Sequence, residues 1–300
     1  MTKPLVSVVI TTKNEEKNIE NCLKSINLQN YENIETIVVD NNSDDRTKEI
    51  SKKYTKKVFN MGPERSSQRN LGMIKKAKGK YVMFLDADMI ISLSLIKNCV
   101  NVLEKENLDG LYLPEIILGQ GFFSGVRRFE RKFYDGTPID GARFFLRESF
   151  VKIGGFDERL YACEDWDLDK RIKKIGKIGI LKEKENTTNW KMKKIINEQG
   201  VNPESYGCVI YHNESEFDLK KYLNKKKYYS KNFEKYINKW GGKDKDIKKQ
   251  FGFYYRFLGA FIENGKWKQF LSSPSYVIGL YYLRFLVGII FILNKKQNEI

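Results

Sequence analysis

Apolar and amphipathic stretches alternate along the first third of the chain. The stretch from Leu5 to Ile10 is almost entirely apolar, and apolar residues then recur at helical spacing from Ile19 to Ile26. This pairing predicts a buried strand followed by a helix with one buried face. It repeats along the chain, with further strands expected at 34–39, 58–59, 80–85 and 110–113. The pattern predicts an α/β fold with a mostly parallel sheet flanked by helices.

The pattern changes twice, and these changes give our predicted division of the chain. Residues 1–115 carry the strand and helix repeat and form a nucleotide-binding type of half-domain. Residues 116–215 complete the domain with shorter, glycine-rich segments. Residues 216–300 are dense in lysine and aromatic residues, which predicts a helical extension.

Composition narrows the class of protein. The 300 residues are 41% hydrophobic, enough to bury a full core. The four cysteines are widely spaced and only one histidine is present, which disfavours a zinc site or a disulfide framework and fits a reducing compartment. Because no cleavable signal precedes the first predicted strand, we expect a cytoplasmic body. The net charge of +16 predicts an anionic partner: nucleic acid, a phospholipid surface or a phosphorylated substrate.

Acidic residues directly follow two of the predicted strands. Asp40 follows the strand at 34–39, and Asp86 and Asp88 follow the strand at 80–85. The carboxyl ends of parallel strands meet at one edge of a sheet, where α/β folds bind ligands. Paired carboxylates there suit Mg²⁺ or Mn²⁺ shared with substrate phosphates. The alternative is that these residues only cap the helices that follow.

Two arginines and one acidic motif add candidate chemistry. Arg65 and Arg69 lie early in a predicted helix near the same edge, where they either bind phosphate or belong to a solvated basic face. Further on, the turn Gly154-Gly155 precedes Glu164 and Asp165 at a predicted helix start. Acids stabilise the start of a helix, but a glycine-rich turn that delivers them into a cleft suggests a catalytic base.

A set of short motifs occurs in a fixed order along residues 4 to 175. They are Val6-Ser7-Val8-Val9-Ile10, Asn14-Glu15-Glu16, Val38-Val39-Asp40-Asn41-Asn42-Ser43, Gln68-Arg69-Asn70-Leu71-Gly72, Phe84-Leu85-Asp86-Ala87-Asp88, Gly154-Gly155-Phe156-Asp157-Glu158 and Glu164-Asp165-Trp166-Asp167-Leu168. In order and spacing they resemble the family 2 glycosyltransferases of GT-A fold. The resemblance implies a nucleotide-sugar donor, a divalent metal and inversion at the anomeric carbon.

The resemblance also implies where the nucleotide binds. Residues 1–115 would be the nucleotide-sugar-binding half of the domain. The base and ribose would be held by Asp40 and by three residues of the first loop, Thr12, Asn14 and Glu15. The chain departs from the family at Thr11, where many members have proline, and at Lys13, where many have an aromatic residue. These departures leave the identity of the nucleotide open.

A metal site follows from the same resemblance. Asp88 would ligate Mn²⁺ or Mg²⁺, Asp86 would contact the ribose or a metal-bound water, and Arg69 would lie near the diphosphate. His212, the only histidine, would be a further metal ligand or phosphate contact, or else a structural residue.

The resemblance assigns the acceptor chemistry to residues 116–215. Asp165 would be the general base, and Glu164 would position it or the acceptor hydroxyl. In the same half, a glycine-rich segment at 119–125 precedes a basic cluster at 127–132. This cluster either closes over a substrate or forms a helix laid on the surface.

The extension contains one amphipathic region and two apolar segments. An aromatic stripe on a single predicted helix, ending at Gly241-Gly242, comprises Tyr222, Tyr229, Phe233, Tyr236 and Trp240. This helix either packs on the body or lies on anionic lipid. The apolar segments, 251–262 and 276–293, contain Arg256 and Arg284. A central arginine costs about 2.5–3.5 kcal/mol in a bilayer, so we favour interfacial or hairpin association over a clean span, with burial on the body as the alternative.

Together these inferences predict a metal-dependent glycosyltransferase that is peripheral to the cytoplasmic face of the cell membrane. Its donor would be a UDP- or GDP-sugar, and its acceptor a polyprenyl-phosphate-linked or cell-surface glycan precursor. The alternatives are a nucleotidyltransferase of related fold and a basic nucleic-acid-binding protein. The loop at 11–16 contains no glycine and no Walker lysine motif, which disfavours the nucleotidyltransferase and P-loop classes. No nucleic-acid recognition motif is present.

Overall fold

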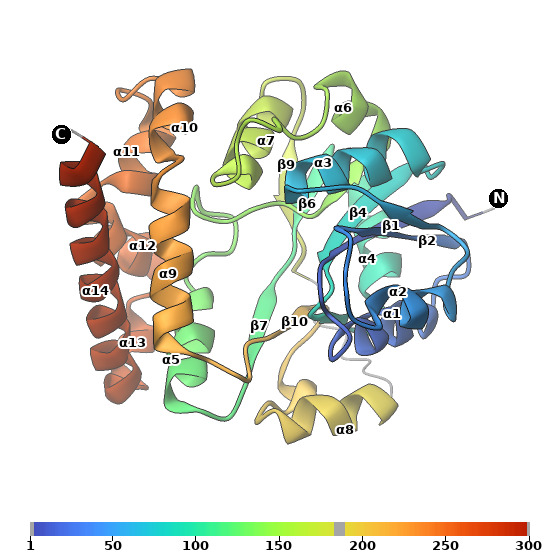
Figure 1. Ribbon diagram of the computed structural model, residues 1–300. Coiled ribbons are helices and arrows are strands. Elements are labelled where there is room, and N and C mark those ends of the chain that lie inside the picture. Colours follow the sequence, from blue (N-terminus) through green and yellow to red (C-terminus); the bar gives the residue numbers. More distant parts are fainter. Residues whose placement is uncertain (1–2, 183–189, 299–300) are drawn as a thin grey trace.

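A seven-stranded sheet forms the centre of the molecule, which we describe for residues 3–182 and 190–298 of a computed structural model (Figure 1). Its strands are β1 (Val6–Thr12), β2 (Ile34–Asp40), β3 (Val58–Asn60), β4 (Tyr81–Asp86), β6 (Gly110–Tyr112), β8 (Phe144–Leu146) and β9 (Ile178–Ile180). They lie in the order β3-β2-β1-β4-β8-β6-β9. All neighbouring strands are parallel except β8, which is antiparallel to β4 and β6. The predicted mostly parallel sheet is confirmed.

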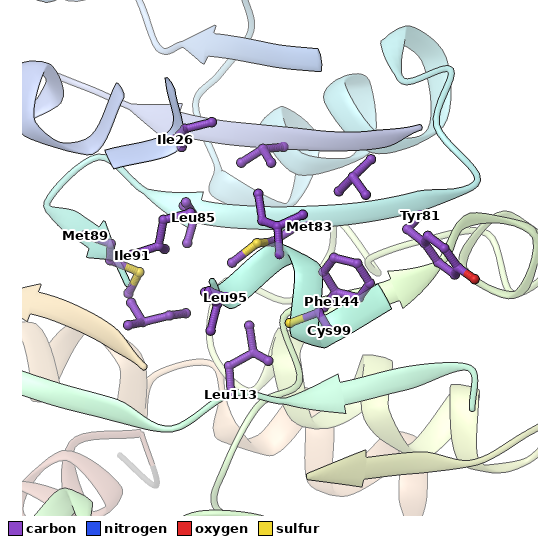
Figure 2. Packing of buried hydrophobic residues seen from close by; sticks show 14 of the residues in the cluster. Ile26, Tyr81, Met83, Leu85, Met89, Ile91, Leu95, Cys99, Leu113 and Phe144 are labelled. Atoms are coloured by element: carbon purple, nitrogen blue, oxygen red, sulfur yellow. The ribbon is translucent and has the colours of Figure 1, made fainter. Parts of the chain in front are cut away.

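Helices cover both faces of this sheet. Side chains alternate along a strand, so Val8 and Val9 of β1 enter different cores. The Val8 core packs on α1 (Ile19–Asn27) and α4 (Leu95–Glu106), as Figure 2 shows. The remaining helices against the sheet are α2 (Thr47–Lys52), α3 (Arg65–Asn70), the π-helix η1 (Leu71–Lys76), α6 (Arg147–Lys152) and α7 (Glu164–Lys173). Burial on both faces explains why the strands read as nearly continuous apolar runs.

A second, three-stranded sheet lies beside the carboxyl end of β4. It consists of β5 (Met89–Ile91), β10 (Ile210–Asn213) and β7 (Glu115–Leu118), in that order. Strand β10 pairs antiparallel with β5 and parallel with β7. Helix α8 (Trp190–Glu198) and the short helix η2 (Pro203–Ser205) precede β10. The pairing brings the end of the second half of the chain next to the acids that follow β4.

The C-terminal segments and one earlier helix form a separate helical layer. Its elements are α5 (Phe122–Arg131), α9 (Leu219–Ser230), α10 (Phe233–Trp240), α11 (Lys245–Phe251), η3 (Tyr255–Gly259), α12 (Ala260–Ile262), η4 (Glu263–Gly265), α13 (Lys268–Leu271) and α14 (Pro274–Asn298). Helix α14 forms the outer edge of this layer, far from the sheet (Figure 1). The layer has its own apolar core, to which α5 contributes Val126 and Phe129.

The basic cluster at 127–132 behaves differently from both of our expectations. Neither a lid nor a surface helix forms, because α5 packs between β7 and α14. Its arginines are paired inside the molecule: Arg127 lies 3.2 Å from Glu214, Arg128 donates to the Ile117 carbonyl at 2.6 Å, and Arg131 lies 2.9 Å from Asp140. These basic residues therefore join the helical layer to the small sheet.

The prediction of a single helix that ends at Gly241 is also wrong. The helix is interrupted at Lys231-Asn232, between α9 and α10. The break splits the aromatic stripe. Tyr222 packs into the core of the helical layer, whereas Tyr236 packs with Leu160 and Ile247 in a separate cluster. The predicted end at Gly241 is confirmed, since this residue has a φ of 84° directly after α10.

Helix α14 has one buried face and one exposed face. Leu280, Leu283 and Arg284 are buried against the layer, and the Arg284 guanidinium lies 3.0 Å from Glu130 of α5. The opposite face exposes large apolar side chains at helical spacing, which are Ile278, Tyr282, Phe285, Ile289 and Ile292. By length and composition Pro274–Asn294 could cross a membrane, but 22% of that window is buried in the molecule. Arg284, which the sequence placed in a possible span, thus has a protein partner.

Candidate functional site

The acids predicted at the strand ends do meet at one edge of the large sheet. Asp86 is the last residue of β4 and pairs with Thr11 of β1, while Asp40 is the last residue of β2 and pairs with Thr12. Asp88 follows Asp86 by two residues, and its carbonyl accepts from the Asn213 backbone at 2.9 Å. The edge is therefore completed by β10 from the far end of the domain.

Asp86 is held by two arginines. The Arg69 guanidinium lies 3.2 Å from Asp86 Oδ1, and that of Arg143 lies 3.6 Å from Oδ2. Burial alone would raise the pKa of Asp86, but Arg69 and Arg143 lower it well below its usual range. Asp86 is therefore a fixed negative charge at the edge of the sheet.

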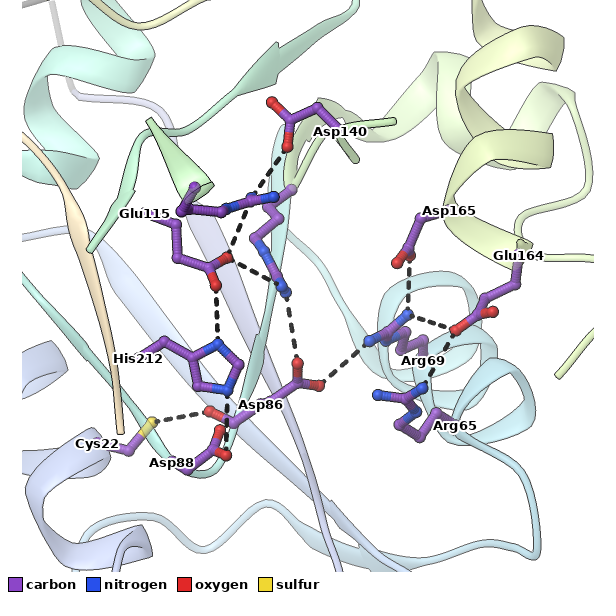
Figure 3. A network of polar contacts seen from close by, with 12 residues as sticks. Cys22, Arg65, Arg69, Asp86, Asp88, Glu115, Asp140, Glu164, Asp165 and His212 are labelled. Carbon is purple, nitrogen blue, oxygen red and sulfur yellow. Dashed lines mark hydrogen bonds and ion pairs between the residues drawn. The ribbon is translucent and has the colours of Figure 1, made fainter. Parts of the chain in front are cut away.

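Arg69 joins this edge to the second acidic motif. Its side chain is 1% exposed and packs over the Phe84 ring at 4.1 Å. While Nη2 contacts Asp86, Nη1 donates to Asp165 Oδ1 at 3.0 Å and lies 3.7 Å from Glu164 (Figure 3). One guanidinium thus spans the two predicted carboxylate sites. In this structure, the hydrogen-bond donors of the Arg69 guanidinium are directed at carboxylates.

A turn and a strained residue present Glu164 and Asp165. Gly155 has a φ of 68°, and a Cβ there would lie 2.4 Å from the Asn70 side chain, so only glycine fits this turn. Cys163, just before α7, has a left-handed φ of 63°. Asp165 keeps 34% of its side chain exposed, whereas Glu164 keeps 6%. Burial and the neighbouring Asp165 raise the pKa of Glu164, although Arg65 at 3.6 Å opposes this.

His212 lies between two carboxylates. Its Nε2 faces Asp88 Oδ2 at 3.3 Å, and its Nδ1 faces Glu115 Oε1 at 2.8 Å (Figure 3). Burial would lower the pKa of His212, but Asp88 and Glu115 raise it well above its usual value. Because Nδ1 is directed at Glu115, Nε2 is the nitrogen that faces Asp88.

Sequence reasoning missed Glu115 and Arg143. Glu115 is 7% exposed and contacts His212, Arg131 at 3.2 Å and Arg143 at 3.5 Å. The sequence offered one signal for Glu115, which is that it is the only acid in the otherwise apolar strand 115–118. Arg143 precedes β8, and only the insertion of β8 beside β4 brings it to Asp86.

The residues around Asp88 fit a divalent cation. Asp88 Oδ1 is buried and has no hydrogen-bond partner within residues 3–182 and 190–298. Burial raises the pKa of nearby Glu15, and the charges of Asp88 and Asp86 raise it further, so negative charge is in excess here. No group of three or more His, Cys, Asp or Glu side chains among the described residues is arranged to hold a metal alone. An ion here would be shared with oxygens of a substrate.

The predicted nucleotide loop is ordered by its own polar contacts. Asn14 has a left-handed φ of 53°, and its backbone N–H donates to the Ser43 hydroxyl at 2.8 Å. Asp40 is fully buried, and both of its carboxylate oxygens accept bonds from Ser43. Asp40 is therefore held in place by Ser43 and fixes the shape of the loop. The Thr12 hydroxyl is buried without a partner among the described residues.

Known proteins provide an independent comparison. The sequence model described as "Glycosyl transferase family 2" matches residues 7–152. The chain is 33% identical over 155 residues to the uncharacterized glycosyltransferase EpsJ of Bacillus subtilis (strain 168), covering 50% of this chain and 42% of that protein. It is 31% identical over 193 residues to the uncharacterized glycosyltransferase RP339 of Rickettsia prowazekii (strain Madrid E), covering 58% of this chain and 60% of that protein. The chain thus spans about half the length of these curated relatives.

Solved structures share the fold. The mannosyltransferase PcManGT from Pyrobaculum calidifontis, in complex with GDP-Man and Mn²⁺, superposes with a TM-score of 0.59 at 17% identity, covering 98% of this chain and 88% of that chain. Residues 1–349 of S. aureus TarS give a TM-score of 0.55 at 17% identity, covering 98% and 91%. These likenesses confirm the predicted GT-A architecture over the whole described chain.

Proposed function

Because residues 7–152 belong to glycosyl transferase family 2, we propose that this chain is a metal-dependent inverting glycosyltransferase. It moves a sugar from a nucleotide-sugar donor to a hydroxyl acceptor. Residues 1–115 bind the donor, residues 116–215 supply the base and acceptor side, and residues 216–300 form the membrane-associating tail. A GDP-sugar or UDP-sugar donor is supported by the GDP-Man and UDP-GlcNAc named for the solved neighbours PcManGT and TarS.

The observation that carries this proposal is the bridge made by Arg69 between Asp86 and Asp165. It places the carboxylates suited to a cation and the candidate base on opposite sides of one guanidinium. An acceptor hydroxyl beside Asp165 loses its proton to this carboxylate as its oxygen bonds to the anomeric carbon. The bond from that carbon to the nucleoside diphosphate breaks at the same time, which inverts the centre.

Each residue then has a defined task. Mn²⁺ or Mg²⁺, held by Asp88 with Asp86 and His212 beside it, would neutralise the departing diphosphate. Arg69 exchanges its carboxylate contacts for the diphosphate as the donor enters. Asp165 is the base because it is the more exposed acid, and Glu164, held near Arg65 and Arg69, positions the acceptor side.

The exposed apolar face supports the proposal that the tail binds a membrane from the cytoplasmic side. Besides the free face of α14, large apolar residues of η3, α12 and α13 are exposed. They are Leu258, Ile262 and Leu271. Lysine and arginine outnumber acids more than two to one in residues 216–300, which suits anionic lipid. Since the other face of α14 is fixed on the layer, it lies in the membrane plane without crossing. The free cysteines among the described residues agree with a reducing compartment.

The catalytic proposal is tested by separating binding from transfer. A thermal-shift panel of UDP, GDP and CMP with Mn²⁺, Mg²⁺ or EDTA identifies the nucleotide, because a ligand of the native state raises its melting temperature. Transfer of labelled sugar from the matching nucleotide sugar to a membrane-lipid extract then gives the activity. Asp165→Asn should abolish this transfer and leave the nucleotide shift unchanged. Undiminished transfer by Asp165→Asn would exclude it as the base.

A further inference from the structure

Four cations gather where α5, α9, η3 and α14 meet. We call this set the cationic junction; it consists of Arg127, Lys226, Arg256 and Arg284 with the carboxylates Glu130 and Glu214. In Figure 1, α9 lies beside α14 on the side toward the sheet. The junction therefore lies within the helical layer, and Glu214, which follows β10, connects it to the acceptor half of the domain.

Two of these cations use both carboxylates. Arg127 lies 2.7 Å from Glu130 and 3.2 Å from Glu214, and Arg284 lies 3.0 Å from Glu130. Within residues 3–182 and 190–298, no described carboxylate lies within salt-bridge distance of Lys226 or Arg256. Arg284 Nη1 is also buried without a hydrogen-bond partner in the part of the chain that the structure describes. In the cationic junction, which is only partly exposed to water, basic side chains therefore outnumber carboxylates.

Lys226 shows most clearly that positive charge is in excess in the cationic junction. Its Nζ lies 5.2 Å from the centre of the Tyr222 ring, and the Arg127 guanidinium lies 5.5 Å from the same ring. Burial, with help from Arg127 and Arg256, lowers the pKa of Lys226 to about 7. A lysine with this pKa is partly neutral near pH 7, and an anion bound beside it would favour the charged form.

The junction is connected to the proposed base. Tyr229 is three residues after Lys226, so the two lie on the same face of α9. The Tyr229 hydroxyl accepts from Arg65 at 2.8 Å, and Arg65 lies 3.6 Å from Glu164. Arg256 acts electrostatically on Cys163, the residue before Glu164. Tyr229 and Arg65 thus connect the cationic junction to Glu164, the neighbour of Asp165.

We propose that Lys226 and Arg256 form a binding site for a phosphate group of the acceptor. This inference rests on the proposed glycosyl transfer and names the chemical class of its acceptor, a phosphate ester or diphosphate. A phosphate held there offsets the unpaired positive charge and places a neighbouring hydroxyl beside Asp165. The phosphate belongs either to a lipid-linked diphosphate or to a soluble phosphodiester, and the chemistry of recognition is shared.

The experiment measures probe binding by isothermal titration to protein presaturated with the nucleotide and metal found in the thermal-shift panel. The probes are farnesyl diphosphate for the lipid-linked source and glycerophosphoglycerol for the phosphodiester. Variants Lys226→Gln and Arg256→Gln are compared with wild type and with Lys227→Gln, which removes an exposed lysine from the same helix. We expect Lys226→Gln and Arg256→Gln each to weaken one probe at least about tenfold, while Lys227→Gln and nucleotide binding stay unchanged.

Each outcome bears on the proposal. Selective weakening at Lys226 and Arg256 supports it, and the probe affected identifies the source of the phosphate. Equal weakening by Lys227→Gln, or no binding of either probe to wild type, overturns it. Protein that binds a probe through Lys226 but binds no nucleotide would retain the anion site and contradict the proposed donor chemistry. Urea unfolding of each variant checks that the fold is intact.

Discussion

The charged network at the sheet edge and the cationic junction use the same residue types but have opposite balances of charge. Around Asp86 and Asp88, six carboxylates contact four arginines and one histidine. In the cationic junction, four cations lie among two carboxylates. Both are at least partly buried, so water screens neither imbalance as it would at an open surface.

This difference in the balance of charge predicts that the two regions bind ligands of opposite charge. Excess buried charge is costly unless a counter-ion offsets it. The sheet edge therefore favours a cation, and the cationic junction favours an anion. Transfer between a metal-bound nucleotide sugar and a phosphate-bearing acceptor would use both, one on each side of Asp165. The substitutions below test this contrast and are given in decreasing order of the change that we expect.

Asp88→Asn should have the largest effect because it removes a charge from the carboxylate with an unpartnered buried oxygen. We expect transfer to fall at least about a hundredfold and metal-dependent nucleotide binding to weaken with it. Titration of nucleotide with Mn²⁺, and again with EDTA, measures the change.

The control for Asp88→Asn is Glu106→Gln, an exposed acid at the end of α4. It should change neither transfer nor binding. Asp88→Asn protein that binds nucleotide with the same dependence on Mn²⁺ would show that the edge does not need this carboxylate for a cation.

Glu130→Gln should lower stability because it leaves the buried Arg284 and Arg127 without their shared charge. Removing one partner of a buried ion pair costs about 3–5 kcal/mol, which urea unfolding would report. The exposed Glu234→Gln on α10 is the matched control.

The double variant Glu130→Met with Arg284→Met should be less destabilised than Glu130→Gln. A double variant that is more unstable would mean that the pair itself holds α14 in place.

The same carboxylate predicts the direction of a pH effect. Burial would raise the pKa of Glu130, but Arg284 and Arg127 lower it well below its usual range. A carboxylate with a depressed folded-state pKa stabilises the protein above its unfolded pKa, about 4.3. The stability difference between wild type and Glu130→Gln should thus be full above about pH 5 and shrink as the pH falls below 4.3. A difference that grows on acidification would contradict this sign.

Glu115→Gln should have the smallest effect because Arg131 keeps its contact to Asp140 and Arg143 keeps its contact to Asp86, so that the change acts on the cation site only through His212. With Nδ1 of His212 held less firmly, Mn²⁺ affinity in the presence of nucleotide should fall about tenfold. Electron paramagnetic resonance of free Mn²⁺ measures this without any turnover. Glu148→Gln, exposed on α6, is the control. Unchanged Mn²⁺ affinity would make Glu115 a structural partner only.

Much of the fold and part of the site could be predicted from local patterns. Asp40 and Asp86 were placed at one sheet edge because each ends a run of apolar residues, and the register of β1 with β2 and β4 confirms this. Glu115 and Arg143 could not be found that way. Their approach to His212 and Asp86 depends on how β7, β8 and β10 pair across long stretches of chain.

The sequence alone determined the strands, the strand-end acids and the basic apolar tail, because these follow from periodicity and residue chemistry that neighbouring positions share. Only the tertiary structure decided which charges meet. It enclosed the arginines of α5 and gave Arg284 a carboxylate partner, whereas Lys226 and Arg256 have none among the residues that the structure describes. A charge in a sequence is defined by its residue type, whereas its energetic cost depends on burial and on partners that lie far away along the chain.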